Sequence, residues 1–210
     1  MKTLVAPSIL SADFGNLQSE IDSISSADWI QLDVMDGHFV PNLSFGAPVA
    51  KWIKTKLPLD VHLMVKNPAD RIEEFLKIGV KNITFHAEAV LDTTARKALI
   101  EAIHKGGATA GIAIKPESTV ASIEDVISDV DLVLVMSIQP GFAGQKFMPE
   151  VLEKTRTLRA MYPKLMIQID GGIDSATAKL ARDAGVNNLV SATAIFSAKD
   201  RKKAIEEIRG

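Results

Sequence analysis

Eight short apolar segments recur along this chain at a nearly constant interval, and this regularity limits the possible folds more than any other feature. The segments span residues 4–9, 29–34, 59–64, 82–86, 109–114, 132–136, 166–170 and 188–191. They are rich in β-branched residues and show no clean alternation with polar ones, which is typical of strands buried on both faces of a parallel sheet. Between them, apolar residues three and four positions apart predict helices, for example over 72–79, 151–161 and 176–184.

Eight strand–helix units within 210 residues predict an α/β protein with the (β/α)8 barrel, or TIM-barrel, architecture, close to the lower limit of its size. A doubly wound sheet is the alternative, but the even spacing and the lack of an opening Gly-x-Gly-x-x-Gly disfavour it. No linker, low-complexity segment or block of like charge divides the chain, so we expect one domain over residues 1–210.

The composition excludes several functional classes. Lysine and arginine number 24 against 26 aspartates and glutamates, so the chain lacks the basic excess that neutralises nucleic-acid phosphates, and we expect no nucleic-acid partner. The absence of cysteine excludes a thiolate metal site, an iron–sulfur cluster and a cysteine nucleophile. No apolar run reaches the roughly 18 residues that span a bilayer, and Pro7 and Ser8 interrupt the N-terminus before a signal-peptide core could form. We therefore expect a soluble, cytoplasmic protein with no membrane partner.

Polar residues gather at the predicted C-terminal ends of the strands, where barrels of this kind build their active sites. They are Ser8, Asp33, Asp36, His62, His86, Glu88 and Asp170, together with the turns at 139–141, 171–172 and 192–193. Packing alone does not explain polar groups that converge on one rim from so many strands.

Asp33, His62 and Asp170 interrupt otherwise apolar strands, where an unpaired carboxylate would be costly. Brought together at a barrel mouth, they could bind a divalent cation or act as an acid/base pair. Taken singly, each has a plainer explanation: an aspartate after a strand often caps the next helix, and a buried histidine is often a hydrogen-bonded core residue. Asp174 is better placed than Asp170 as such a cap, and the joint presence of all three residues favours a site.

Glycine-rich turns follow the sixth and seventh predicted strands, at 139–145 and 170–172, and a further turn at 191–193 follows the eighth. Backbone N–H groups in these loops commonly bind phosphate in such barrels, which predicts a sugar phosphate as the ligand. The alternative is that the glycines only serve loops that need positive φ angles.

The chain resembles the ribulose-phosphate 3-epimerase family over essentially its whole length. The resemblance is carried by APSILSADF at 6–14, LDVMDGHFVPN at 32–42, LDVHLM at 59–64, VMS and PGFAGQKF within 135–147, and DGGI at 170–173. It implies a TIM barrel of the ribulose-phosphate-binding type that interconverts D-ribulose 5-phosphate and D-xylulose 5-phosphate by inverting C3 through an enediolate.

The resemblance also assigns roles to residues of this chain. Asp33 and Asp170 would be the two catalytic acid/base groups, and with His62 they would ligate one divalent metal ion (Zn, Fe, Mn, Co or Mg). The residues expected to contact the substrate are Ser8, His62, Gly141, Phe142, Ala143, Gly144, Gly171, Gly172, Ala192 and Thr193. The expected partners are a small-molecule sugar phosphate and further copies of the chain in a homo-oligomer.

Two alternatives remain open at this point. The chain could be an epimerase acting on a ketohexose 6-phosphate such as D-allulose 6-phosphate, since the space around the phosphate cannot be measured from the sequence. It could instead be a degenerate barrel that binds sugar phosphates without catalysis. The retention of Asp33, His62 and Asp170 together argues against a mere binder, which would not need both carboxylates.

The chain departs from the family at three places. Gln31 replaces a metal-binding histidine, Ala192-Thr193 replaces the usual Gly-Ser, and Lys115 replaces an asparagine. An amide oxygen can coordinate a metal but suits harder ions than imidazole does. We therefore include Gln31 among the expected metal ligands, and we expect weaker zinc binding with relatively better support by Mn²⁺ or Mg²⁺.

Overall fold

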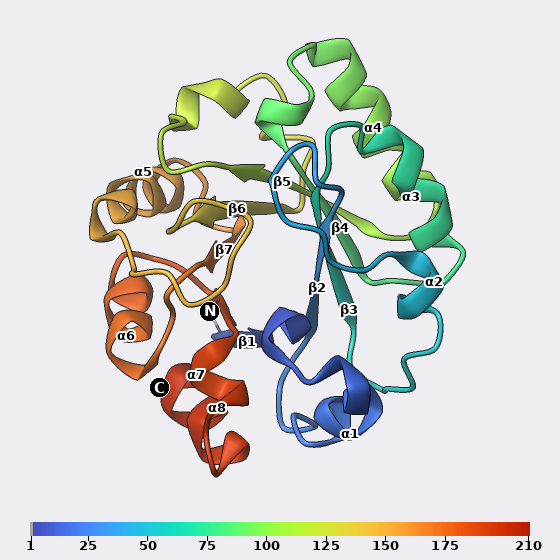
Figure 1. Ribbon diagram of the computed structural model, residues 1–210. Helices are drawn as coiled ribbons and strands as arrows, with labels where there is room; N and C mark the ends of the chain where they lie inside the picture. Colours follow the sequence, from blue (N-terminus) through green and yellow to red (C-terminus); the bar gives the residue numbers. More distant parts are fainter. Residues whose placement is uncertain (1) are drawn as a thin grey trace.

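The computed structural model describes residues 2–210. Eight parallel strands, in the order β1-β8-β7-β6-β5-β4-β3-β2, form a nearly closed barrel with helices around its outside (Figure 1). The strands are β1 (Leu4–Pro7), β2 (Ile30–Met35), β3 (Leu59–Met64), β4 (Asn82–His86), β5 (Thr109–Ile114), β6 (Leu132–Met136), β7 (Met166–Asp170) and β8 (Asn188–Ser191). The predicted TIM-barrel fold is confirmed, and six of the eight strands have the expected bounds.

The helices cover the outer face of the barrel. They are α1 (Leu17–Asp22), α2 (Ala47–Ala50), α3 (Ala69–Leu76), α4 (Thr93–Lys105), α5 (Leu152–Met161), α6 (Ser175–Asp183), α7 (Thr193–Phe196) and α8 (Arg201–Arg209). The prediction of eight regular strand–helix units was wrong at one place, because the segment between β5 and β6 has only a 3-10 helix, Val120–Ile123. This segment is rich in valine, isoleucine, serine and aspartate, all of which are weak helix formers.

The barrel has a seam between β1 and β2, which are not adjacent in the hydrogen-bonded strand order. The backbone amide of Asp28 donates to the carbonyl of Val5 at 3.0 Å and joins the two sides at one end. At the other end a single bridge pairs Ser8 with Gln31. The seam therefore brings Ser8 and Gln31 side by side at the end of the barrel where the strands terminate.

Alternation along each strand separates two kinds of core. One face of every strand packs against the helices in the large apolar core, to which Val5, Leu32 and Val61 belong. The opposite face points into the barrel, where a smaller apolar cluster includes Ala6 and Met136. Because side chains alternate with period two, the polar residues of β2, β3, β4 and β7 also face the interior. They are Gln31, Asp33, Asp60, His62, Asn82, Thr84, His86, Gln168 and Asp170.

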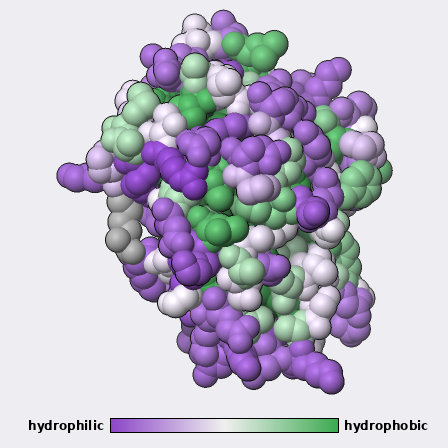
Figure 2. All heavy atoms as spheres, turned by 90° about the vertical axis from the view of Figure 1, so that its left-hand side faces the viewer, coloured by the Kyte–Doolittle hydropathy of each residue, from purple (hydrophilic) through white to green (hydrophobic). Residues whose placement is uncertain are grey.

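The outer surface is mainly polar. The side of the molecule that carries α5 and α6 is largely hydrophilic, with apolar side chains in several separate patches, one of them near the centre of the view (Figure 2). Among residues 2–210, every helix is too short or too polar to cross a membrane.

Candidate active site

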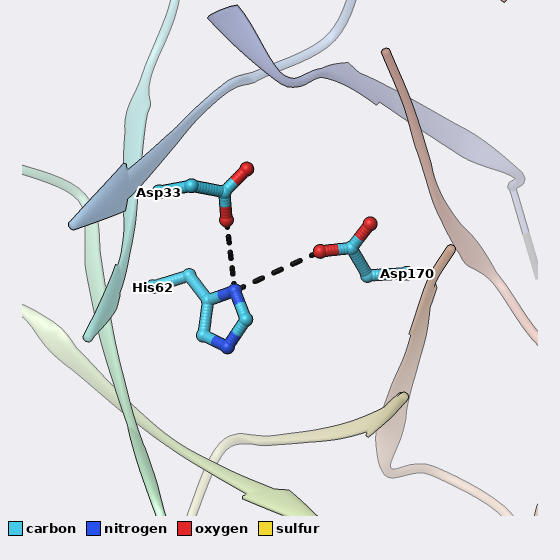
Figure 3. A group of neighbouring side chains, drawn as sticks. All are labelled: Asp33, His62 and Asp170. Carbon is cyan, nitrogen blue, oxygen red and sulfur yellow. Dashed lines mark hydrogen bonds and ion pairs between the residues drawn. The ribbon is translucent and has the colours of Figure 1, made fainter. Parts of the chain in front are cut away.

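Asp33, His62 and Asp170 meet inside the mouth of the barrel (Figure 3). They come from β2, β3 and β7, and the register pairs Asp33 directly with His62 on the neighbouring strand. The Nδ1 atom of His62 lies 2.8 Å from Oδ1 of Asp33 and 3.7 Å from Oδ2 of Asp170. One ligand atom from each residue lies within 4.8 Å of the other two, so the group could hold a metal ion.

Gln31 lies directly beside this group. Its side-chain amide nitrogen donates to Oδ1 of Asp33 and to Oδ2 of Asp170, both at 2.9 Å. Its other amide atom, Oε1, is buried and has no hydrogen-bond partner among the described residues. The amide nitrogen of Gln31 therefore links the two carboxylates. Its amide oxygen is left as an acceptor that a further group could use.

Ser8 supplies another contact to the same group. Its hydroxyl donates to Oδ2 of Asp33 and accepts from the backbone amide of Leu10 at 3.2 Å. Asp33 thus receives donors on both carboxylate oxygens, which fixes the orientation of its side chain.

Burial and charge set the protonation of the group. Burial, and after it the charge of Asp33, raise the pKa of the Asp170 carboxyl to about 7. Burial acts to lower the pKa of His62, but the hydrogen bond to Asp33 and the charges of Asp33 and Asp170 outweigh it and raise that pKa. Two close carboxylates in a buried site disfavour each other's ionisation and favour a cation between them.

Asp33 and Asp170 line a cavity of about 510 Å³ that opens at the barrel mouth. All the expected substrate-contacting residues except His62 line the same cavity. His62 and Gln31 are fully buried behind the carboxylates. Three methionines that end strands, Met35, Met64 and Met136, add an apolar surface to the wall.

Residues of the loops after β6, β7 and β8 form one side of the cavity. Gly172 has a φ of +63°, and a Cβ there would lie 2.6 Å from the backbone nitrogen of Phe147. Only glycine allows the loops after β6 and β7 to approach this closely. The side-chain amide of Asn42 donates to the carbonyl of Gly141 at 2.9 Å and ties the loop after β6 to the loop after β2.

The turn after β8 continues this wall. Ala192 precedes the short helix α7, and the hydroxyl oxygen of Thr193 lies 3.3 Å from that of Ser11. Asp174, not Asp170, caps α6: it accepts from the amides of Ala176 and Thr177, both at 2.9 Å. The alternative interpretation of Asp170 as a helix cap is therefore wrong.

Sequence analysis placed His86 and Glu88 at the rim without giving them a role. The structure brings the ring of His86 against that of His62, with 2.9 Å between their Nε2 atoms. Nothing in the sequence near His86 indicates this contact, because it depends on the register between β3 and β4. Lys115 does not line the cavity; its ammonium lies 4.3 Å above the ring of Phe39.

Comparison with known proteins gives consistent results. The model of the "Ribulose-phosphate 3 epimerase family" matches residues 4–196. The chain is 44% identical over 212 residues to the ribulose-phosphate 3-epimerase, cytoplasmic isoform, of Oryza sativa subsp. japonica, and the alignment covers 98% of this chain and 92% of that relative. It is 45% identical over 217 residues to the ribulose-phosphate 3-epimerase of Bacillus subtilis (strain 168), with 98% of each chain covered.

Solved structures show the same architecture at much lower identity. KGPDC from Streptococcus mutans superposes with a TM-score of 0.79 at 13% identity, covering 100% of this chain and 96% of that one. The 3-hexulose-6-phosphate synthase from Salmonella typhimurium gives a TM-score of 0.73 at 17% identity, covering 98% and 96%. These likenesses concern the fold alone.

Proposed function

The chain belongs to the ribulose-phosphate 3-epimerase family, a family of isomerases, and from this premise we propose that it inverts C3 of D-ribulose 5-phosphate to give D-xylulose 5-phosphate. The observation that carries the proposal is the pair of carboxyl groups, Asp33 and Asp170, that enter one cavity from different strands. Inversion of a carbon next to a carbonyl needs a base on one face of that carbon and an acid on the other. Two carboxyl groups on separate strands can supply both.

The two carboxyl groups would act in sequence. One carboxylate takes the proton from C3, and the electron pair of the broken C–H bond moves toward the C2 carbonyl to form an enediolate. The other carboxyl group returns a proton to the opposite face of C3 as the carbonyl reforms, and the roles exchange in the reverse direction. A carboxyl group acts as a base when ionised and as an acid when protonated, so each of the two residues can serve in either direction of the reaction.

Asp33, His62 and Asp170 would hold one divalent ion, with Oε1 of Gln31 as a fourth ligand. Two observations support the fit: the carboxylate and imidazole atoms lie within 4.8 Å of one another, and Oε1 is a buried acceptor without a partner among the described residues. When bound, such an ion supplies Lewis-acid stabilisation of the negative charge that develops on the substrate. One nitrogen donor among oxygens suits Mn²⁺ or Mg²⁺ better than a two-histidine site would.

The substrate phosphate would bind on the side of the cavity that the loops after β6, β7 and β8 form. The loops there line the cavity with Gly144, Gly171, Gly172, Ala192 and Thr193. Backbone N–H groups after the last strands of such barrels are a common phosphate site. Ser8 would contact the sugar near the reacting carbon, since its hydroxyl already bonds Asp33.

An isotope-exchange experiment tests the proposal. Metal-stripped protein is reloaded with single divalent ions, and D-xylulose 5-phosphate formation is followed by a coupled assay, with deuterium uptake at C3 followed by NMR in D₂O. We expect product and C3 deuteration that depend on the added ion. D-Allulose 6-phosphate, assayed in parallel, separates a hexose-phosphate epimerase. No exchange with either sugar phosphate would contradict the proposal and favour a barrel that only binds.

We also propose a cytoplasmic location and self-association. The relative from Oryza sativa is named a cytoplasmic isoform, which supports the location. Leu43, Trp52 and Leu91 are 70%, 71% and 84% exposed, so large apolar side chains are available for contact with a further copy of the chain. Sedimentation equilibrium of the purified protein tests the second part.

A further inference from the structure

A second histidine lies behind the proposed metal ligand His62. His86 ends strand β4, and its ring is as completely buried as that of His62. The two ring centroids are 5.0 Å apart and the two Nε2 atoms are 2.9 Å apart. At this distance one nitrogen carries a proton and donates it, and the other accepts it. The identity of the donor decides which nitrogen of His62 faces the carboxylates without a proton.

Glu88 contacts the other ring nitrogen of His86, and this contact determines which histidine donates the proton in the His62–His86 hydrogen bond. Its Oε2 lies 3.2 Å from Nδ1 of His86. Its Oε1 accepts from the backbone amide of Lys115 at 2.8 Å and from the hydroxyl of Ser118. Burial acts to raise the pKa of Glu88, but the bond from His86, followed by those from Lys115 and Ser118, holds it at about 2. An ionised carboxylate can only accept, so Nδ1 of His86 must donate to it.

The remaining nitrogen of His86 then has to be an acceptor. A proton on both nitrogens would place a cation in a fully buried position, which is costly. A neutral ring carries one proton, and the Glu88 carboxylate holds it on Nδ1. The Nε2 atom of His86 therefore accepts from His62, and the proton in their contact belongs to His62.

Donation from His62 to His86 determines which atom of His62 faces Asp33. With its proton on Nε2, the neutral ring of His62 presents the lone pair of Nδ1 to Oδ1 of Asp33, 2.8 Å away. A lone pair facing a carboxylate oxygen at that distance is repulsive unless a cation lies between them. A proton fills the 2.8 Å between the two atoms in the metal-free protein. A divalent ion would be bound by both atoms in its place, and the arrangement of His86 and Glu88 is the same for both.

We infer that Glu88, acting through His86, keeps the ring proton of His62 on Nε2 and so leaves Nδ1 for the divalent ion, an inference that rests on the proposed function. Both are positioning residues, because neither lines the substrate cavity. Partners that fix the tautomer of a ligating histidine commonly change metal affinity about 10–100-fold when they are altered.

The variant Glu88→Gln should reverse the direction of the hydrogen bonds through His86 while keeping the size and shape of the side chain at position 88. The amide oxygen takes the position of Oε1, because the Lys115 amide and the Ser118 hydroxyl both donate there. The NH₂ group then faces His86 and donates to its Nδ1, which moves the His86 proton to Nε2. His62 must accept that proton on its own Nε2, and its Nδ1 is no longer free.

The test measures tautomer and zinc affinity together. NMR of protein labelled with ¹⁵N-histidine locates the ring proton of His86, and a chelator competition measures Zn²⁺ affinity. We expect the His86 proton on Nδ1 in the wild type and on Nε2 in Glu88→Gln, with zinc bound about 10–100-fold more weakly by the variant. Glu117→Gln, an exposed carboxylate-to-amide change on the segment after β5, is the matched control and should keep wild-type affinity.

Three results would overturn the inference: a wild-type His86 proton on Nε2, an unchanged His86 tautomer in Glu88→Gln, or unchanged zinc affinity in that variant. If Glu88→Gln does not fold, the wild-type protein decides alone: a His86 proton on Nδ1 supports the inference, and a proton on Nε2 overturns it. A wild type that binds no zinc refutes the metal site of the proposed function instead, while the His86 tautomer in the same sample still decides the direction of the contact.

Discussion

Replacing Gln31 by histidine should tighten zinc binding at the proposed metal site. In the structure the Gln31 amide nitrogen donates to Asp33 and Asp170, so the group facing the carboxylates is a donor and not a ligand. An ion between these residues requires the amide to turn and present Oε1, which is buried and has no partner among the described residues. Histidine would instead offer a nitrogen with a high preference for zinc.

The size of the effect follows from the contacts. Turning the amide gives up two hydrogen bonds to charged groups, each 2.9 Å long, and such bonds contribute about 1.5–3 kcal/mol each. In the wild type, coordination by Oε1 would have to offset this loss. Altering the groups that support a metal ligand commonly changes affinity about 10–100-fold, which corresponds to about 1.4–2.7 kcal/mol, and we take the same range for the added imidazole. We therefore expect Gln31→His to bind Zn²⁺ about 10–100-fold more tightly and to gain less for Mn²⁺.

Chelator competition with Zn²⁺ and Mn²⁺ on metal-free protein measures both affinities. Gln31→Leu is the control, because it keeps the bulk of the side chain and offers neither donor nor acceptor. If Oε1 is a ligand, Gln31→Leu binds Mn²⁺ more weakly than the wild type. Unchanged affinity of Gln31→His for both ions, or Mn²⁺ binding by Gln31→Leu as tight as that of the wild type, would refute the reasoning and remove position 31 from the ligand set.

Four further outcomes are expected. Asp33→Asn and Asp170→Asn should each lower kcat at least about a hundredfold, and deuterium exchange at C3 checks this; near-normal exchange in either variant removes that residue from its role. Unphosphorylated D-ribulose should have a far lower kcat/KM than its 5-phosphate, because remote binding energy positions the reacting carbon. Burial raises the pKa of Asp170 from 3.8 to about 7. Asp170 therefore stabilises the metal-free fold fully below pH 3.8, and this contribution is lost as the pH rises through about 7. In urea unfolding curves, Asp170→Asn should make the free energy of unfolding fall less over this pH range. Asp174→Ala should lower the free energy of unfolding by about 0.5–2 kcal/mol by removing the cap of α6, and equal urea midpoints would contradict this.

The strands could be predicted from the sequence because each is buried on both faces. Such segments must be apolar nearly throughout, and a polar residue within them is conspicuous. Asp33, His62 and Asp170 were found in this way, and the barrel topology then brings their strand ends to one rim. The connection between β5 and β6 departs from the regular strand–helix repeat, since it forms only the 3-10 helix Val120–Ile123 and its many valine, isoleucine, serine and aspartate residues are weak helix formers.

The partners of these residues could not be predicted. The contact of His86 with His62 depends on which positions face each other across β3 and β4, and a shift of one residue would turn every side chain to the other face. The orientation of Gln31 depends on two carboxylates, one of them 139 positions away in the chain. Local sequence holds no signal for either contact. The acidic partner of His86 lies only two residues away, yet its role depends on donors from Lys115 and Ser118 on another loop.

The interior of the barrel holds more acid than base, and this imbalance links the proposed metal, the pKa shifts and the role of the amides. Asp33, Asp60 and Asp170 all point inward with one basic partner, His62, in direct contact with two of them. Burial raises the pKa of Asp60 to about 6, although the amides of Gln168 and Asn82 donate to it. Neutral amides can orient carboxylates but cannot cancel their charge. A divalent cation at the barrel mouth would cancel it directly, so the same uncompensated charge that weakens the metal-free fold at rising pH favours the ion that the proposed chemistry needs.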